Sequence, residues 1–248
     1  MSKTDNIYIK KARKKRLIKR IIVSLIFLGI ISCIVVFKTD IFIINSVEYK
    51  GDIVVTGDYV KNKSKSLYGE NIFSFDKDEI ISKLKKNPYV KDVVINRKLP
   101  KKLILNITEA KGLFFINEEN NKAIISSDLI LLEKNNEKDT DNLIEIKGLD
   151  TSSIKIGDKI SADTRLDSIL NELYDEQGII KKNKEEFRIV SVDLSDLSNI
   201  KVYLNNIEVR IGTDENLRKK MSNAITVYKV GLSQEYIDVS FNGTPDFK

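Results

Sequence analysis

The 248-residue sequence contains no histidine, no tryptophan, a single cysteine and three prolines. Without histidine, the chain can form no Ser-His or Cys-His catalytic arrangement, no imidazole metal site and no imidazole pH switch. A single cysteine excludes an internal disulfide and a cysteine-rich zinc site. No glycine-rich phosphate-binding loop occurs in the sequence. We therefore expect no enzymatic activity, no cofactor and no bound metal.

The net charge of +6 is distributed very unevenly along the chain. The first twenty residues hold nine lysines and arginines and one aspartate, so they carry +8 and the other 228 residues carry −2. Nucleic-acid binding requires basic residues spread over a folded face. Because the excess basic charge lies in a tail, no nucleic-acid partner is expected.

A long uncharged run follows this basic tail. Residues 21–37 include thirteen Ile, Leu, Val or Phe residues and no charged residue. As a helix the run would be about 25 Å long, slightly shorter than a ~30 Å hydrocarbon core, and Arg20 and Lys38 can reach the interfaces. The excess of positive charge before the run predicts a cytoplasmic N-terminus. The sequence thus predicts a cytoplasmic basic tail over 1–20, a transmembrane helix over 21–37 and an extracytoplasmic remainder, which is a single-pass protein of the cell membrane.

Two processing alternatives compete with a permanent membrane anchor. A cleaved signal peptide would end in small residues, whereas residues 37–40 read Phe-Lys-Thr-Asp. The segment Ile30-Ile31-Ser32-Cys33 resembles a lipobox, so lipidation of Cys33 is the sharper alternative. The apolar run continues for four residues beyond Cys33, which favours a membrane helix. An anchored or lipidated extracytoplasmic binding module, with Cys33 as the acylated residue in the lipidated form, is therefore the second hypothesis.

The first exterior zone has the pattern of a small α+β domain. Alternation predicts a strand over 44–51, and a helical stretch is expected over 56–67. Residues 72–75 would supply a hydrophobic plug of Ile72, Phe73 and Phe75. Asp76 and Glu79 have capping-box spacing, so a helix should begin there and end before Pro88. Two more alternating strands, over 89–96 and 103–109, complete a β-α-α-β-β order.

Four segments of this zone carry a family resemblance. They are IINSVEYKG at 43–51, GENIFSFD at 69–76, NPYVKDV at 87–93, and a segment at 97–109 that opens with RKLP and ends with TE. In this order, directly behind a single span, they resemble a POTRA domain of the FtsQ/DivIB type over 43–110. Members of that family are bitopic bacterial division proteins with one span, a POTRA domain and a following β domain.

The second zone, 111–248, has the pattern of that β domain. Leu166, Ile169, Leu170 and Leu173 have the spacing of a helix that buries one face. Asp214 is expected to cap a second helix. The segment 209–212, this helix with Lys219 and Lys220, and the segment 236–245 are similar to the closing elements of the family. We predict an α+β chain whose second domain is mixed, with an antiparallel-type sheet and flanking helices. The expected strands cover 113–116, 123–126, 130–133, 143–146, 155–160, 188–194, 200–204, 207–211 and 236–241.

One catalytic-looking string occurs in this zone. Ser152-Ser153-Ile154-Lys155 matches S-x-x-K, the nucleophile motif of penicillin-binding enzymes. The sequence contains neither the S-D-N nor the K-T-G element that would complete such a site. We therefore interpret the string as a chance match and expect no catalytic residues.

The terminal strand is the candidate binding site. Alternation over 236–241 would place Ile237, Val239 and Phe241 in the core. If this strand is the border of the sheet, its unpaired backbone groups could accept a strand from a partner. The resemblance implies that this region receives a segment of a small bitopic coiled-coil division protein, FtsB/DivIC-like or FtsL-like, by strand addition. The candidate partner-binding residues are Tyr236, Asp238, Ser240, Phe241, Asn242 and Gly243.

The resemblance also implies a function. The chain would be a non-enzymatic scaffold of the divisome that binds other division proteins outside the membrane and helps to regulate septal peptidoglycan synthesis. Its expected location is the division septum, and its expected partners include further divisome components.

Overall fold

The computed structural model describes residues 3–119, 121–135, 137, 139–231, 235–241 and 243–248, with side chains from residue 14 onward. The chain divides into two compact units, one of Met1–Leu84 with Asp92–Thr108 and one of Lys85–Lys91 with Glu109–Lys248. The α+β class is confirmed, with an N-terminal apolar helix, a POTRA domain and a mixed sheet domain with flanking helices.

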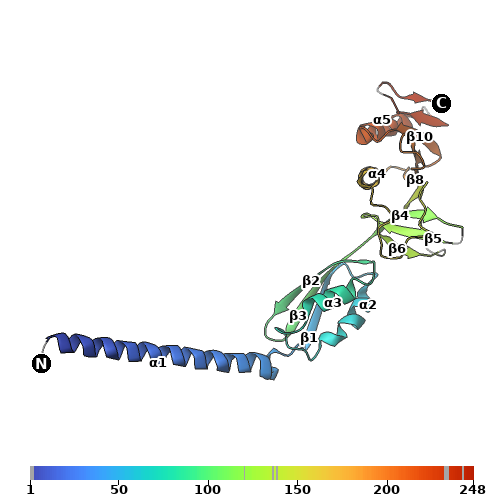
Figure 1. The fold of residues 1–248 in the computed structure, drawn as a ribbon. Coiled ribbons are helices and arrows are strands. Elements are labelled where there is room, and N and C mark those ends of the chain that lie inside the picture. The colour runs from blue at the N-terminus through green and yellow to red at the C-terminus, as the bar shows by residue number, and fades with distance from the viewer. Residues whose placement is uncertain (1–2, 120, 136, 138, 232–234, 242) are drawn as a thin grey trace. The chain divides into compact units, whose positions relative to one another are not determined.

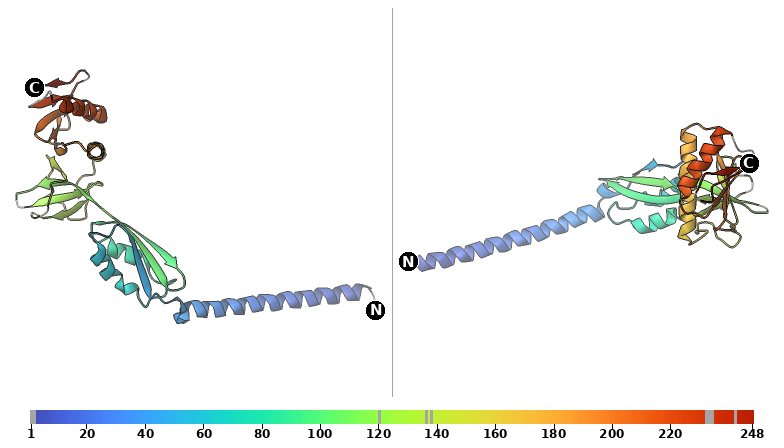
Figure 2. Two further views of the ribbon diagram at one scale, coloured as in Figure 1. Left: turned by 180° about the vertical axis from the view of Figure 1, so that it is seen from behind. Right: turned by 90° about the horizontal axis from the view of Figure 1, so that it is seen from above.

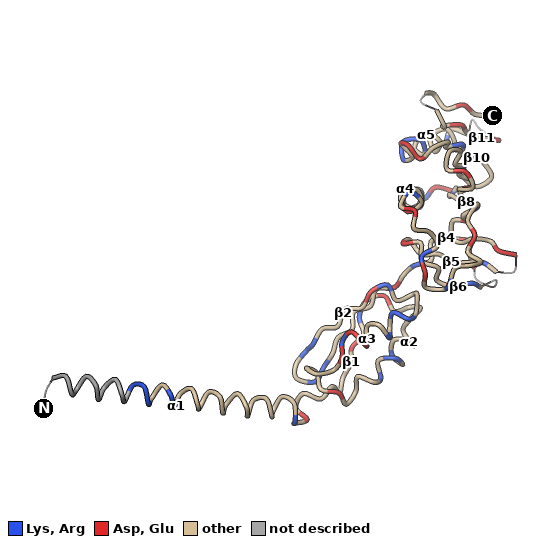
Figure 3. The backbone as a smooth tube through the Cα atoms, viewed as in Figure 1, with Lys and Arg blue, Asp and Glu red and all other residues tan. Residues whose placement is uncertain are grey.

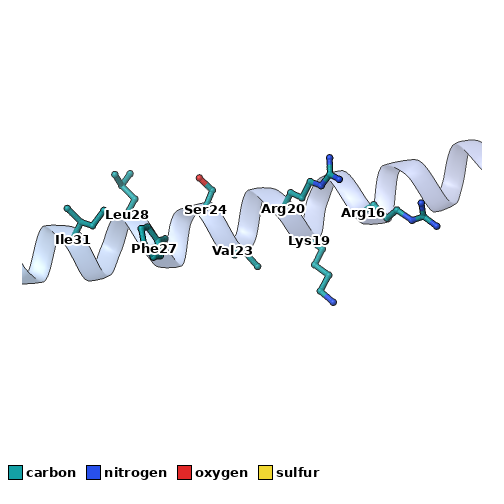
Figure 4. A pocket seen from close by; sticks show the side chains of 8 residues that line it. All are labelled: Arg16, Lys19, Arg20, Val23, Ser24, Phe27, Leu28 and Ile31. Atoms are coloured by element: carbon teal, nitrogen blue, oxygen red, sulfur yellow. The ribbon is translucent and has the colours of Figure 1, made fainter.

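The N-terminal helix α1 covers Lys3–Lys38, so the helix includes the basic tail as well as the apolar run. Lysine and arginine are good helix formers, which explains why the helix does not end at the charge boundary. Within the described residues, one helical stretch, Lys14–Lys38, is long and apolar enough to cross a membrane. Figure 3 shows basic residues at the start of the stretch Lys14–Lys38 and uncharged residues after them. In Figure 4 the basic Arg16, Lys19 and Arg20 are followed along the helix by mostly apolar side chains, of which Leu28 points away from the helix.

The POTRA domain has the expected order of elements (Figure 1). The described residues of the first unit form a three-stranded sheet in the order β1-β3-β2, in which β1 is parallel to β3. Both helices lie on one side of this sheet in Figure 1. Asp76 Oδ1 accepts hydrogen bonds from the backbone N–H groups of Asp78 (3.0 Å) and Glu79 (2.9 Å), which confirms the predicted helix start. The elements are the 3-10 helix Asp40–Phe42, β1 (Ser46–Gly51), α2 (Gly57–Lys63), the 3-10 helix Ser64–Leu67, α3 (Lys77–Leu84), β2 (Val90–Lys98) and β3 (Lys102–Glu109).

The predicted hydrophobic plug is only partly buried. Ile72 and Phe75 lie in the POTRA core, with 0% and 8% of their surface exposed, but Phe73 is 39% exposed. The Phe73 ring instead packs edge-on against Phe42, at a centroid distance of 5.2 Å. The prediction was therefore wrong for Phe73, because its partner comes from the segment that follows the span rather than from the core.

The second unit is built on a large mixed sheet. Its described residues form nine strands in the order β12-β11-β10-β9-β8-β7-β4-β5-β6. The pairs β4–β7, β7–β8 and β10–β11 are parallel, and the other described pairs are antiparallel. Helices α4 (Thr164–Lys182) and α5 (Leu217–Val230) lie side by side in Figure 2. The strands are β4 (Gly112–Asn117), β5 (Lys122–Ser126), β6 (Leu131–Lys134), β7 (Ile144–Lys147), β8 (Ile189–Asp193), β9 (Ile200–Leu204), β10 (Ile207–Gly212), β11 (Tyr236–Asp238) and β12 (Asp246–Phe247).

The main core of this unit lies between the sheet and the two helices. Phe114 of β4 is fully buried there, and so is the predicted stripe of α4. Four residues of that stripe, Leu166, Ile169, Leu170 and Leu173, are at most 5% exposed. The helical period in the sequence therefore identified the buried face of α4 correctly.

Two local predictions were wrong in this unit. The segment 155–160 forms turns that bond to the chain around β6, with Leu131 N–H donating to Asp158 O (3.0 Å) and Gly157 N–H donating to Leu131 O (2.8 Å). Asp214 does not cap α5, whose N-cap residue is Asn216. Arg165 donates from Nε (3.0 Å) and Nη2 (2.6 Å) to Asp214 Oδ1 and lowers the pKa of this carboxyl. In both cases a tertiary contact replaces the local one.

A buried carboxyl on α4 leads to a prediction about pH and stability. Glu176 is 6% exposed, and its nearest described cation, Arg218, has Nε 3.8 Å from Oε1. Burial raises the pKa of Glu176 above its ordinary value of 4.5, so the folded state binds this proton more tightly than the unfolded state. The resulting stability is present at acid pH and is lost as pH rises through the folded-state pKa. Glu176→Gln should therefore raise the free energy of unfolding at neutral pH, by on the order of 1 kcal/mol, and have little effect at about pH 4.

Thermal unfolding measured over a pH series checks this prediction. Glu172→Gln is the matched control, because Glu172 lies one turn earlier on α4 and is only half-buried. A stabilisation by Glu176→Gln that does not depend on pH would contradict the assigned cause.

Candidate partner-binding site at the C-terminal strands

The candidate site lies where the last strands form one border of the large sheet. β11 pairs in parallel with β10, with Glu208 opposite Tyr236 and Arg210 opposite Asp238. On its other side β11 pairs antiparallel with β12, with Ile237 opposite Phe247. The expectation that 236–241 forms the border strand was therefore wrong, because β12, which the sequence pattern does not predict, covers that edge.

β11 ends at Asp238, earlier than predicted, because the Asp238 side chain forms hydrogen bonds with Ser240. Asp238 Oδ1 accepts hydrogen bonds from Ser240 N–H (2.9 Å) and Ser240 Oγ (2.7 Å), a turn that competes with strand pairing. Ile237 and Val239 are buried, as predicted, with 0% and 3% of their surface exposed. Phe241 follows the turn and is 48% exposed, so its predicted core position was wrong. Asn242, the fifth candidate residue, lies outside the described residues.

A charged and aromatic cluster lies beside Tyr236. The guanidinium carbon of Arg210 lies 4.0 Å from the centre of the Tyr236 ring, which is a cation–π contact. Arg210 Nε donates to Glu208 Oε1 at 2.8 Å, and this hydrogen bond lowers the pKa of Glu208. Lys201 Nζ lies 3.6 Å from Glu208 Oε2. The cluster gives the outer face of β9, β10 and β11 an ordered set of polar groups next to the candidate edge.

Glu208 and Arg210 are not among the binding residues predicted from the sequence. Alternation in 207–211 does place Glu208 and Arg210 on one face of the strand and the buried Val209 and Ile211 on the other face. Their spacing of two residues on one face was therefore a usable signal. Their contact with Tyr236 requires the parallel pairing of β10 and β11, which alternation alone does not predict.

A small hollow of about 260 Å³ opens between the end of β11 and α5. Phe241, Val239 and Gly243 line one side, and residues of α5 line the other, including Lys219 and Asn223. Lys220 Nζ, at the base, donates to the carbonyl oxygens of Ile211 and Thr213, each at 2.9 Å. The Phe241 ring lies so close to Gly243 that a Cβ there would be 3.2 Å from it. The hollow therefore has an exposed aromatic wall and a basic opposite wall.

The S-x-x-K string has no catalytic setting in the structure. Ser152 lies in a turn, and its Oγ donates to Asp150 Oδ2 at 2.6 Å. This hydrogen bond lowers the pKa of Asp150. Across the part of the chain that the structure describes, no three metal-ligating side chains are grouped together.

Comparisons with known proteins agree with this architecture. Residues 42–110 match the family model described as POTRA domain, FtsQ-type. Residues 115–240 match the model described as cell division protein FtsQ/DivIB, C-terminal. The predicted closing segment 209–212 falls inside the second match, and so do the first five residues of the segment 236–245.

Several relatives are similar over most of the chain, and all carry the name cell division protein DivIB. The protein from Clostridium botulinum (strain Hall) is 36% identical over 245 residues, which cover 97% of this chain and 94% of the relative. The one from Clostridium acetobutylicum is 33% identical over 219 residues, 86% of each chain. The one from Clostridium tetani is 27% identical over 214 residues, 84% of this chain and 80% of the relative.

These matches cover the POTRA domain and the sheet domain, and the most extensive of them reach into the N-terminal part of the chain. They count against the alternative of a binding module unrelated to division. Together with the apolar helix α1 they identify a single-pass membrane protein involved in division. This chain belongs to the FtsQ/DivIB family of cell division proteins.

Proposed function

We propose that the chain is a non-enzymatic scaffold of the divisome. Its POTRA and β domains would bind other division proteins outside the membrane and help to regulate septal peptidoglycan synthesis. Family membership supports a role in division, and the +8 charge of the first twenty residues supports a cytoplasmic N-terminus. The proposed parts are a cytoplasmic tail over 1–20, a span over 21–37, a POTRA domain over 43–110 and a β domain over 111–248, and the proposed location is the division septum.

The proposed partner segment is a strand from an FtsB/DivIC-like or FtsL-like division protein. The observation that carries this proposal is the weakness of β12, which has two residues, both exposed. Lys248 O accepts from Glu235 N–H (2.7 Å) and Tyr236 N–H (3.3 Å), and Lys248 N–H donates to Tyr236 O (3.2 Å). So short a strand costs little to displace, and a longer partner strand would form more backbone hydrogen bonds along β11.

The direction of the backbone hydrogen-bonding groups of β11 is compatible with replacement of β12 by a partner strand. The backbone N–H and C=O of Tyr236 point toward β12, whereas Val239 N–H donates to Arg210 O on the β10 side, at 3.0 Å. Tyr236 and Asp238 are therefore the residues of β11 whose backbone a partner strand would meet, and the strand could continue to Ser240 only if Ser240 N–H leaves Asp238 Oδ1. Phe241 and Gly243 would offer the hollow to an apolar partner side chain, and Lys219 on the opposite wall would favour an acidic neighbour.

The test measures capture of the partner's exterior segment by the full chain in lipid nanodiscs. Phe241→Lys should weaken binding about tenfold, because it removes an apolar contact and adds positive charge to a basic hollow. Removal of residues 246–248 should strengthen binding, because no strand then has to be displaced. Ile179→Lys is the matched control, since Ile179 on α4 is similarly exposed (49%, against 48% for Phe241) and does not line the hollow.

Near-ultraviolet circular dichroism would establish that each variant is folded. If folded Phe241→Lys binds the partner as well as the unaltered chain, the C-terminal strands are not the partner site. If removal of residues 246–248 weakens binding, the partner pairs with β12 instead of replacing it.

A further inference from the structure

The POTRA domain is hydrogen-bonded directly to the end of the membrane span. The last carbonyls of a helix have no partner within the helix, and in apolar surroundings each unpaired carbonyl is costly. Here Val35 O accepts from Thr39 Oγ1 (2.5 Å), and Val36 O accepts from Asn71 Nδ2 (2.6 Å). Asn71 lies in the POTRA loop between the 3-10 helix Ser64–Leu67 and α3. This loop therefore completes the last turn of α1.

The same loop is bonded along the segment that joins the span to β1. Ile72 N–H donates to Phe42 O (2.8 Å), and Gly69 N–H donates to Ile44 O (3.1 Å). Ile43 and Asn71 form an isolated antiparallel bridge. The loop 69–75 and the segment 39–45 thus form one hydrogen-bonded structure at the end of α1.

The turn between β2 and β3 lies at the same end of the domain (Figures 1 and 2). Asn45 N–H donates to Lys101 O at 3.1 Å, and the β1–β3 register begins at Ser46 and Lys102. Arg97 Nε donates to Ile72 O at 2.7 Å, which joins this turn to the loop 69–75. Both loops are therefore held next to the point where the span ends.

The surface made by these loops is apolar and basic. Its exposed apolar side chains are Phe37 (53% exposed), Ile41 (49%), Phe73 (39%) and Leu99 (56%). Its basic side chains are Lys38, Arg97, Lys98 and Lys101, against the acidic Asp40 and Glu70. Exposed apolar groups flanked by lysine and arginine are typical of surfaces that enter the interface of an anionic bilayer. We call these ten residues the juxtamembrane surface.

We propose that the juxtamembrane surface docks on the outer leaflet of the membrane that α1 crosses, with Leu99 and Phe73 in the interface and the basic residues on anionic headgroups. The surface is continuous with the span, since Phe37 belongs to α1 and Ile41 follows it within one turn. The Asn71 hydrogen bond prevents the domain from swinging freely about the end of the helix. The inference does not depend on the partner site at β11.

Fluorophore labelling of the full chain in liposomes tests this docking. In a Cys33→Ser background, single cysteines replace Leu99, Phe73 or Val54 and carry an environment-sensitive nitrobenzoxadiazole label. Val54 is the control, because it is 89% exposed in the same domain but lies beyond the far end of β1. The liposomes contain phosphatidylglycerol and phosphatidylcholine, or phosphatidylcholine alone, with nitroxide-labelled lipid as the quencher.

Lipid quenching at positions 99 and 73 should exceed that at position 54 by about threefold or more, and should fall without the anionic lipid. Equal quenching at all three positions would overturn the proposal. Labels at 99 and 73 that become protected only after a protein extract is added would also overturn it, because the occupant would then be a protein.

Asn71→Asp tests the hydrogen bond to the span. The variant keeps the side-chain oxygen that accepts from Phe73 N–H (2.9 Å) but loses the amide that donates to Val36 O. The docked state should become about fivefold less populated, seen as weaker lipid quenching at position 99. Unchanged quenching in a folded Asn71→Asp protein would overturn the tethering role of Asn71.

Discussion

Gly51→Ala is expected to cost the POTRA domain about 3 kcal/mol of folding free energy or more. Gly51 is the last residue of β1 and has a φ of +91°, a backbone conformation that residues with a Cβ rarely adopt. A Cβ at this position would lie 2.1 Å from the carbonyl oxygen of Ile107, its partner on β3. Because the obstructing atom belongs to the backbone, the alanine fits only if the parallel pairing of β1 and β3 opens.

Hydrogen–deuterium exchange of the full chain in detergent micelles measures this loss unit by unit. Amides of β1, β2 and β3 should lose protection, whereas α4 and α5 in the other unit should keep theirs. Gly69→Ala is the matched control in the same unit, since Gly69 has a φ of +88° but nothing within 4 Å of its Cβ position. That variant should cost only about 1 kcal/mol of backbone strain. Equal losses in the two variants would show that the contact with Ile107 is unimportant.

Phe114→Ala is expected to cost the β domain about 4 kcal/mol. Phe114 is fully buried on β4, an interior strand of the large sheet, opposite Ile125 on β5 and Ile144 on β7. Its ring also meets Tyr174 of α4 edge-on, at a centroid distance of 6.5 Å. Removal of the ring leaves a cavity between sheet and helix that the surrounding strands cannot fill without losing their pairing.

Denaturant unfolding followed by exchange in α4 and β8 measures the effect. Phe115→Ala is the matched control, because Phe115 is the next residue on β4 but faces the other side of the sheet and is half-buried. It should cost less than about 2 kcal/mol. Phe114→Ala should also abolish partner capture while the lipid quenching at position 99 is unchanged, because the two sites belong to different units. If the partner binds a Phe114→Ala chain with an unfolded β domain as well as it binds the unaltered chain, the proposed site is wrong.

Local sequence patterns predicted most of the regular elements. The Asp76 cap, the alternation of β2 and β3 and the helical stripe of α4 all depend on interactions within a few residues, and the structure confirms each. Periodicity of buried residues is a local property, so a single sequence contains it in full. The mixed character of the second domain was also predicted and is confirmed.

The errors share a physical cause. The segment 155–160 has strand-like residues but bonds to the chain around β6 as turns, and Asp214 could cap a helix but pairs with Arg165, distant in sequence. Phe73 and Phe241 are apolar residues that the fold leaves exposed. In each case two arrangements satisfy the local chemistry, and contacts with distant segments decide between them.

At the candidate site, too, the sequence predicted local features but not contacts between distant segments. The sequence identified the segment that contains Tyr236 and Asp238, since its alternation and its resemblance to the family are both local. The sequence did not predict that β12 pairs with the edge of β11, because a strand of two residues is too short to show an alternating pattern. It also did not identify the contact of Arg210 with Tyr236, which exists only because β10 and β11 run in parallel.

By itself, the sequence determined the membrane helix, the absence of histidine and disulfide chemistry and the family of this chain. Each of these follows from residues that are contiguous or from residue types that are missing. Only the tertiary structure decided which strand borders the large sheet and which side chain completes the end of the span. Asn71 bonds to Val36, 35 residues earlier in the chain, and β12 pairs antiparallel with β11. Such contacts depend on the folded path of the backbone, because hydrogen bonds between distant residues leave no periodic trace in the sequence.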